Sequence, residues 1–206
     1  MENSLAIIGA GGIGSHFCRE LSRMMDHDQL QGLTKDAVTV YDFDIVEQKN
    51  LRHQDFKAED LAHPKSFIMT VRYGFPSAEI RFADKHLSKH SHYAVCADNP
   101  GVRRLVYEHC MTYKKPFIDM RAEGDRIAIF THLEDPHILR SSLGEESEST
   151  EGRSCQTVID TEANRIQMGN AVVAPMGVQM YMRLFREETF PRSIIEVIDG
   201  SRTVRR

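Results

Sequence analysis

The sequence predicts an α/β fold in which helices cover a mainly parallel sheet, and three observations support this. Short apolar runs typical of strands alternate with longer segments of helical periodicity. The first run, 5–8, stops at Gly9-Ala10-Gly11-Gly12-Ile13-Gly14, a pattern typical of a strand that enters a helix through a tight turn. The second run, 37–41, stops at Asp42-Phe43-Asp44. Together they indicate a Rossmann-like, doubly wound sheet.

The remaining elements follow from the spacing of apolar residues. Residues 12–26 place Ile13, Phe17 and Leu21 at helical spacing, and 78–82 alternate as a strand does. In chain order, we expect strands at 5–8, 37–41, 78–82, 93–97, 116–120, 127–130 and 194–198, and helices at 12–26, 62–73, 102–113 and 163–186.

The C-terminal half departs from the parallel pattern. Only a short Ala-Glu-Gly-Asp link precedes 127–130, so we expect antiparallel strands toward the C-terminus. Residues 134–153 are rich in Ser, Glu and Gly, which predicts a mobile surface loop. Pro175 is expected to kink the last helix, and the tail at 202–206 is expected to fray.

Length and composition indicate one soluble domain spanning 1–206. The formal charge of −4 gives no field suited to DNA or an acidic membrane, and no apolar stretch is long enough for a bilayer. We expect a cytoplasmic protein. Cys18, Cys96 and Cys110 fall in apolar segments and are expected to be reduced core residues. The sequence has no CxxC pair, so it lacks the usual spacing of a structural zinc site.

The glycine turn indicates a nucleotide site. Glycines at 9, 11 and 14 let backbone N–H groups and a helix N-terminus approach a phosphate, and the carboxylates of Asp42 and Asp44 suit ribose hydroxyls. The alternative is that the glycines serve only close packing of helix on strand. A GxGxxG pattern usually suggests NAD or FAD, so residues further along the chain must decide the ligand.

Further polar blocks follow the second and fourth predicted strands and supply groups that suit the phosphates of a nucleotide. Phosphates are negatively charged, so such a site needs cations and hydrogen-bond donors around them. Lys65 and Arg52 bring charge, and Asn50 and Gln54 bring donors. Asp98 ends the strand at 93–97 and suits Mg²⁺.

These blocks resemble the ThiF/MoeB family, whose adenylating fold is shared with ubiquitin-activating enzymes. That family's pattern is GxGGxGS, DxDxVxxxNLxRQ, a lysine, and DNxxxR. The chain has these in the same order, and the resemblance extends to Lys115-Pro116 and Ser154-Cys155-Gln156. The matching positions are Gly9 to Ser15, Asp42 to Gln54, Lys65, Asp98, Asn99 and Arg103.

The resemblance implies an ATP-dependent adenylyltransferase that uses Mg²⁺ and acts as a homodimer. Its substrate would be the C-terminal glycine of a ubiquitin-like or sulfur-carrier protein, although the family also activates peptides and modified nucleosides in RNA. By resemblance, Asp98, Arg52 and Lys65 are catalytic, and Asp98 binds the metal. The nucleotide would contact Gly9, Gly11, Gly12, Gly14, Asp42, Asp44, Asn50, Gln54, Lys65, Asn99 and Arg103.

Some interpretations stay open. His53 stands where the family has arginine, with Arg52 one residue early. This favours, as an alternative, a non-catalytic partner of a ubiquitin-like protein; an NAD-dependent oxidoreductase is a further one. Cys155 is a candidate thioester or persulfide carrier or a merely structural cysteine. Three histidines before the strand at 93–97 are expected to be exposed rather than metal-binding: His86, His90 and His92.

Overall fold

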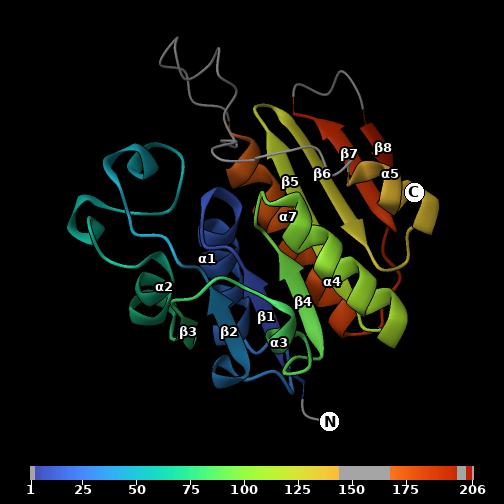
Figure 1. Ribbon diagram of the computed structural model, residues 1–206, viewed down its shortest axis with the longest axis horizontal. Helices are drawn as coiled ribbons and strands as arrows, with labels where there is room; N and C mark the ends of the chain where they lie inside the picture. The colour runs from blue at the N-terminus through green and yellow to red at the C-terminus, as the bar shows by residue number, and fades with distance from the viewer. Residues whose placement is uncertain (1–2, 144–167, 199–202, 206) are drawn as a thin grey trace.

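The computed structural model describes residues 3–143, 168–198 and 203–205 and contains one eight-stranded sheet (Figure 1). The strand order is β3-β2-β1-β4-β5-β6-β7-β8. Five strands are parallel: β1 (Leu5–Ile8), β2 (Val38–Tyr41), β3 (Ser77–Ala78), β4 (His92–Val95) and β5 (Phe117–Glu123). Three continue the sheet in antiparallel pairing: β6 (Arg126–Thr131), β7 (Ser193–Val197) and β8 (Thr203–Arg205). The predicted fold class is confirmed.

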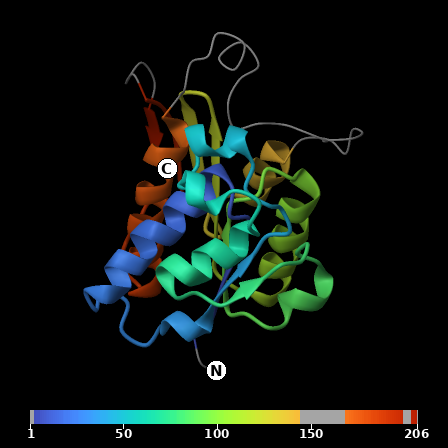
Figure 2. The same ribbon diagram turned by 90° about the vertical axis from the view of Figure 1, so that its left-hand side faces the viewer.

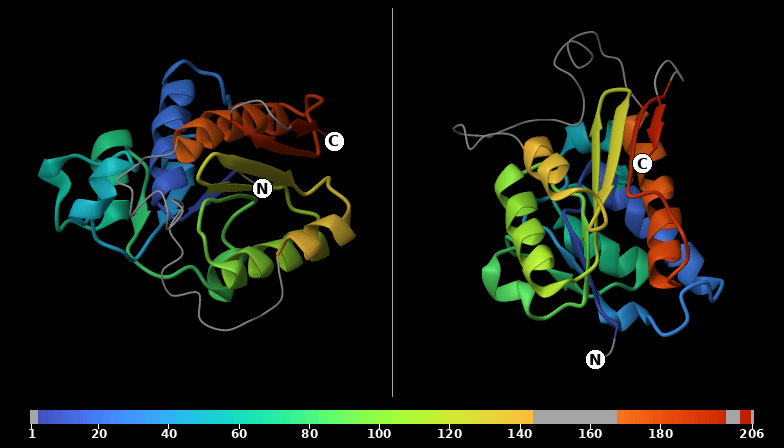
Figure 3. Two further views of the ribbon diagram at one scale, coloured as in Figure 1. Left: turned by 90° about the horizontal axis from the view of Figure 1, so that it is seen from above. Right: turned by 90° about the vertical axis from the view of Figure 1, so that its right-hand side faces the viewer.

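Helices cover both faces of this sheet (Figures 2 and 3). The alternation of side chains in β1 sends Leu5 and Ile7 into one core and Ala6 and Ile8 into the other. The first core lies under α1 (Gly12–Asp26), α2 (Lys65–Tyr73) and α7 (Gly169–Phe185). The second lies under α3 (Asp84–Leu87), α4 (Pro100–Tyr113) and α5 (Pro136–Ser142). Short 3₁₀ turns occupy η1 (Lys35–Ala37), η2 (Gln48–Arg52) and η3 (Ala58–Asp60).

The register of the parallel strands aligns their carboxyl ends. Ile8 lies beside Tyr41 on one side and Val95 on the other, and Val95 lies beside Asp119. The residues that follow β1, β2 and β4 therefore meet at one edge of the sheet, where ligands of such folds gather.

The predicted third strand is wrong over most of its length. Val40 N donates to Pro76 O at 2.8 Å and Asp42 N to Ala78 O at 3.2 Å, and the chain then leaves the sheet. The guanidinium of Arg81 lies 4.3 Å from the centre of the Phe43 ring, and the Phe82 ring lies edge-on to Tyr41. The alternation at 78–82 thus reflects side chains that pack against Tyr41 and Phe43, and the strand pairing itself ends at Ala78.

Two further expectations for the C-terminal half are wrong. The predicted loop at 134–153 contains α5, which Asp135 caps by accepting a hydrogen bond from His137 N at 2.7 Å and which buries Leu139. The tail expected to fray forms β8, where Val204 pairs with Ile195. Residues 144–153, including the rest of that loop, lie outside the described residues.

Two helix boundaries also differ from the prediction. α2 begins at Lys65 rather than at about 62, because Pro64 is its N-cap and Ala62 has a φ of 65°, which is outside the helical region. The last helix is described from Gly169 and includes Pro175, whereas 163–167 lie outside the described residues.

The expectation for the core cysteines is confirmed. Cys18, Cys96 and Cys110 are buried and form no disulfide. Burial raises the pKa of the Cys110 thiol to about 12, so this group stays protonated at neutral pH. Within the described part of the chain, no helix combines the length and the apolar character that crossing a membrane requires.

Candidate functional site

The glycines of the turn between β1 and α1 have different steric roles. Gly9 has a φ of +93°, and a Cβ there would lie 2.9 Å from Ala97 N at the end of β4. A Cβ on Gly14 would lie 1.8 Å from Gly9 O, and one on Gly12 would lie 2.2 Å from the Nδ2 of Asn170. A Cβ on Gly11 would meet nothing within 4 Å. Three glycines therefore serve the packing of the turn, and Gly11 leaves its backbone open to a ligand.

Asp42 fastens the turn to the end of β2. Its Oδ2 accepts a hydrogen bond from Ala10 N at 2.6 Å, and its Oδ1 accepts one from Asp44 N at 2.8 Å. Burial raises the pKa of this carboxyl, although both hydrogen bonds and the nearby charge of Lys65 act in the opposite direction. The carboxylate thus sits directly beside the backbone that a phosphate would approach.

Lys65 carries a buried positive charge at the same edge. Its residue is 6% exposed, and its Nζ lies 3.1 Å from the Oδ2 of Asp44, whose side chain is 52% exposed. The backbone is also fixed, because Lys65 N donates to Asp44 O at 2.9 Å. A lysine is rarely buried this far, and its ammonium is held near Asp42 and His53 instead of extending into solvent.

The segment after β2 forms the wall of the site. Asn50 is buried, and its Oδ1 accepts from Glu47 N at 2.8 Å, which completes the cap of η2. Arg52 is exposed at the end of that turn. The Nε2 of Gln54 lies 3.5 Å from the Nε2 of His53, and the Oε1 of Gln54 is buried without a partner. The backbone of Asn50 and Gln54 is therefore fixed here, while the amide of Gln54 still has an unused acceptor.

Residues that follow β4 lie on the opposite side of the turn. Asp98 is exposed and comes directly after Ala97, the residue that Gly9 contacts. The Oδ1 of Asn99 caps α4 by accepting from Val102 N at 3.1 Å. Arg103 is directed to a different carboxylate, since its Nε lies 3.2 Å from the Oδ1 of buried Asp119. Asn99 and Arg103 thus stabilise the fold at this edge, and their contact with a nucleotide stays a prediction.

The structure adds residues that the sequence patterns did not indicate. Asn170, on the first turn of α7, is 2% exposed and donates from Nδ2 to His53 O at 3.5 Å. Asp119 also forms an ion pair with Arg121, in which the Nη2 of Arg121 lies 2.5 Å from the Oδ2 of Asp119. Neither contact has a sequence signal, because Asn170 lies 117 residues from its partner and Arg121 occupies an ordinary strand position.

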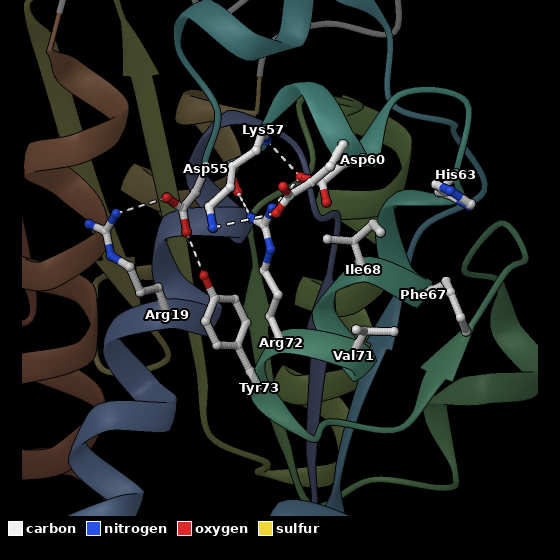
Figure 4. A pocket seen from close by; sticks show the side chains of 11 residues that line it. Arg19, Asp55, Lys57, Asp60, His63, Phe67, Ile68, Val71, Arg72 and Tyr73 are labelled. Atoms are coloured by element: carbon white, nitrogen blue, oxygen red, sulfur yellow. Dashed lines mark hydrogen bonds and ion pairs between the residues drawn. The ribbon is translucent and has the colours of Figure 1, made fainter.

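A pocket of about 650 Å³ lies on the flank of α2, away from Gly11 (Figure 4). Its charged groups are already paired with one another. Arg19 Nη1 and Tyr73 Oη bind the two oxygens of Asp55 at 2.9 and 2.5 Å, and Arg72 pairs with Asp60. Asp55 N in turn donates to the Oγ of Ser15 at 3.0 Å. These contacts hold the segment after Gln54 against α1 and α2, and so position the wall of the site.

The expected exposure of the three histidines is wrong, because none of them is exposed and His92 is itself the first residue of β4. His86 and His90 are buried, and His90 Nε2 lies 2.8 Å from the hydroxyl of Tyr41. His92 is half-buried, and its Nδ1 lies 3.0 Å from the hydroxyl of Tyr181. The described residues contain no cluster of three or more His, Cys, Asp or Glu that could hold a metal ion. Cys155, the candidate acceptor cysteine, lies outside the described residues.

Comparisons with known proteins identify the family and the fold of the chain. A family model described as the ThiF family matches residues 2–194. Among solved structures, E. coli MccB with ATP has a TM-score of 0.65 and 17% identity, over 99% of this chain and 63% of that chain. E. coli MccB with MccA-N7isoASN has a TM-score of 0.68 and 16% identity, over 99% and 63%. Sequence comparison with curated proteins gives no match.

A second kind of solved structure has the same fold. Selenomethionine-labelled PaaA has a TM-score of 0.68 and 12% identity, over 100% of this chain and 64% of that chain. At such low identities the likeness establishes the fold alone. The chain spans less than two thirds of the length of the MccB and PaaA chains that it resembles.

Proposed function

Because the chain belongs to the ThiF family, we propose that it is an ATP-dependent adenylyltransferase that activates a carboxylate as an acyl-adenylate. The single observation that carries this proposal is the convergence of three groups at one sheet edge. Gly11 leaves open backbone, Lys65 supplies a buried positive charge, and Asp98 supplies an exposed carboxylate. An adenylating site needs this combination of phosphate cradle, cation and metal ligand.

The chemistry assigns a task to each group. A carboxylate oxygen attacks the α-phosphorus of ATP, a new P–O bond forms, and the bond to pyrophosphate breaks. The N–H groups at Gly11 and the start of α1 bind phosphate oxygens. Lys65 offsets the repulsion between the two anions, and burial strengthens its effect because water screens it less. Asp42 holds the turn and accepts from ribose hydroxyls.

The donor set also fits Mg²⁺. Asp98 is exposed, and Asp44 is 52% exposed, so both offer carboxylate oxygens of the kind that this cation prefers. Asp98 is the residue that would hold the ion. Bound there, Mg²⁺ would neutralise negative charge on the phosphates.

The proposed substrate is the C-terminal glycine of a ubiquitin-like or sulfur-carrier protein, and a peptide C-terminus is the other candidate. MccB has been solved with N-formylated MccA, which supports a substrate with a free carboxylate at the end of a polypeptide. If Cys155 is competent, transfer to its thiol would follow. We further propose a cytoplasmic homodimer, on the strength of the family resemblance.

One observation favours a second candidate, a non-catalytic partner of such a carrier. The family's arginine position holds His53, and Arg103 is engaged by Asp119. Both reduce the charge available to a triphosphate.

Exchange of pyrophosphate into ATP, driven by a supplied carboxylate, separates the two candidates. We expect exchange with a carrier protein or peptide that ends in a free carboxylate, and a loss of at least about 100-fold in Asp98→Asn, because the metal loses its ligand. Asp36→Asn is the matched control, since Asp36 is exposed beside η1, far from the carboxyl edge.

Full exchange in Asp98→Asn would contradict the assigned role of Asp98. Binding of a carrier without exchange, in a wild-type chain that binds ATP, would favour the non-catalytic partner.

A further inference from the structure

Unpaired polar atoms gather on one side of the glycine turn. Among the described residues, three buried side-chain atoms without a hydrogen-bond partner come from residues around His53. They are the Nδ1 of His16, the Oε1 of Gln54 and the Oδ1 of Asn170. Native proteins rarely leave such atoms unpaired, so a group of three indicates that a ligand or a rearrangement completes them.

His53 lies at the centre of this group. Asn170 donates to its carbonyl oxygen at 3.5 Å, and the Nε2 of Gln54 lies 3.5 Å from its ring Nε2. His16 on α1 interacts with the same carbonyl, and Lys65 on α2 lies close enough to affect the His53 ring. Side chains from α1, α2 and α7 therefore converge on His53, those of α1 and α7 at its backbone carbonyl, beside the proposed phosphate site.

One contact bears on the resting state of this ring. The Nε2 of Gln54 can only donate, so in its 3.5 Å contact the Nε2 of His53 acts as the acceptor. Burial lowers the pKa of His53, and the charges of Lys65 and His16 lower it further. The contact and the surroundings both favour the uncharged ring when no ligand is bound.

Resting on the adenylyltransferase proposed above, we propose that His53 binds the triphosphate in its protonated form, so that ATP binding takes up one proton from solvent, and that Gln54 and Asn170 are positioning residues for that state. The proton adds to Nε2. Rotation of the Gln54 amide by half a turn then lets its Oε1 accept from Nε2–H, which satisfies the atom that is now unpaired. Asn170 holds the His53 backbone while the ring changes charge.

The other charged groups nearby favour this uptake only when an anion is present. Lys65 and His16 face His53, and His16 in turn faces Asp55, Arg19 and Glu20. Without a phosphate, Lys65 opposes a second cation beside it. A bound triphosphate attracts both Lys65 and protonated His53. The protonated ring then provides the positive charge that the family's arginine would provide at this position.

The test measures binding of a non-hydrolysable ATP analogue with Mg²⁺ by calorimetry, in buffers of different ionisation enthalpy, between pH 6.5 and 8.5. We expect wild-type binding to take up close to one more proton than His53→Gln near the middle of this range. Its Kd should then fall by more than tenfold toward low pH, because uptake of nearly a whole proton needs the pKa of His53 to rise by about two units, and each unit is a factor of ten. His53→Arg should bind tightly with no such pH dependence. His63→Gln is the matched control, an exposed histidine outside the cluster.

Gln54→Glu isolates the positioning role. A carboxylate beside Nε2 keeps His53 protonated before the nucleotide arrives, so binding should persist while the extra proton uptake disappears. Equal proton uptake in wild type and His53→Gln would overturn this inference about His53 and leave the proposed function standing. Absence of analogue binding by the folded wild-type chain would overturn the proposed function together with it.

Discussion

At the scale of single residues, the glycines of one turn differ in whether a side chain at their position would collide with its neighbours. A Cβ on Gly14 would collide with a backbone oxygen at 1.8 Å, whereas one on Gly11 would enter open space. A sequence motif treats these positions alike, but only the three-dimensional neighbours separate packing from ligand approach. The glycine pattern therefore predicted the turn, and the structure shows which glycine has open space around it.

This difference gives a paired prediction. Gly14→Ala should lower the free energy of unfolding by about 3 kcal/mol or more, because backbone must move to admit the methyl group. Gly11→Ala should leave stability within about 1 kcal/mol and weaken binding of the ATP analogue, because its Cβ projects toward the phosphates. Urea unfolding and calorimetry measure the two effects. Equal stability losses in both variants would contradict this assignment.

Single residues also show why the sequence could not predict all of the candidate site. Asp98 was predicted because it follows a recognisable strand end, and Lys65 because it stands in register with the family's other blocks. Asn170 and Asp119 were not, because their partners are brought near only by folding. Burial of His90 escaped prediction for the same reason, since the hydroxyl that it meets belongs to Tyr41, 49 residues away.

At the scale of elements, the caps of the helices account for several boundaries. Asn99 caps α4 and Asp135 caps α5, and in both helices a proline occupies the first turn. The first cap lies in the Asp-Asn-Pro-Gly sequence that follows β4. The second was hidden by the Ser/Glu/Gly-rich composition that follows, which is why a loop was expected at 136–142.

The cap of α4 yields a prediction about Asn99. Asn99→Ala should lower the free energy of unfolding by about 1 kcal/mol, the usual cost of losing a capping acceptor, and Asn99→Ser should retain most of the stability. Urea denaturation of both variants measures this. If Asn99→Ala left stability unchanged and abolished nucleotide binding, the side chain would act on the ligand instead of the helix.

Strand pairing was predicted well where apolar runs are buried on both faces and poorly at the edges. All four residues of β1 are buried, so its pattern is unambiguous. β3 and β8 are edge strands of two and three residues, too short for periodicity to define. Their extent is decided by neighbouring side chains such as Phe82 and by pairing with β7.

At the scale of the whole molecule, buried histidines make stability depend on pH. Seven of the ten histidines have a lowered pKa, chiefly because of burial, and those of His90 and His92 fall to about 4. Unfolding exposes these rings, whose pKa then returns to about 6.5. Below that pH the unfolded chain binds more protons than the folded chain, so stability falls as pH falls.

We therefore expect the free energy of unfolding to be nearly constant above about pH 7 and to fall between about pH 6.5 and 4, with His90 and His92 each contributing on the order of 2 kcal/mol. Urea unfolding across this range measures the slope. His90→Gln should flatten it, whereas His27→Gln, at an exposed position, should not. A slope that is identical in both variants would contradict a role for His90.

The strand order has a consequence for the way the chain acquires its shape. β1 lies between β2 and β4, and the bonds that join Ser4 to Ser91 span 87 residues. Gly9 packs on Ala97, so the turn cannot reach its final form until β4 has been synthesised and paired. Contacts this distant in sequence form slowly. During translation, the early β–α–β unit would therefore emerge before the proposed phosphate-binding turn is finished, and nucleotide would stabilise the chain only once β4 has been made.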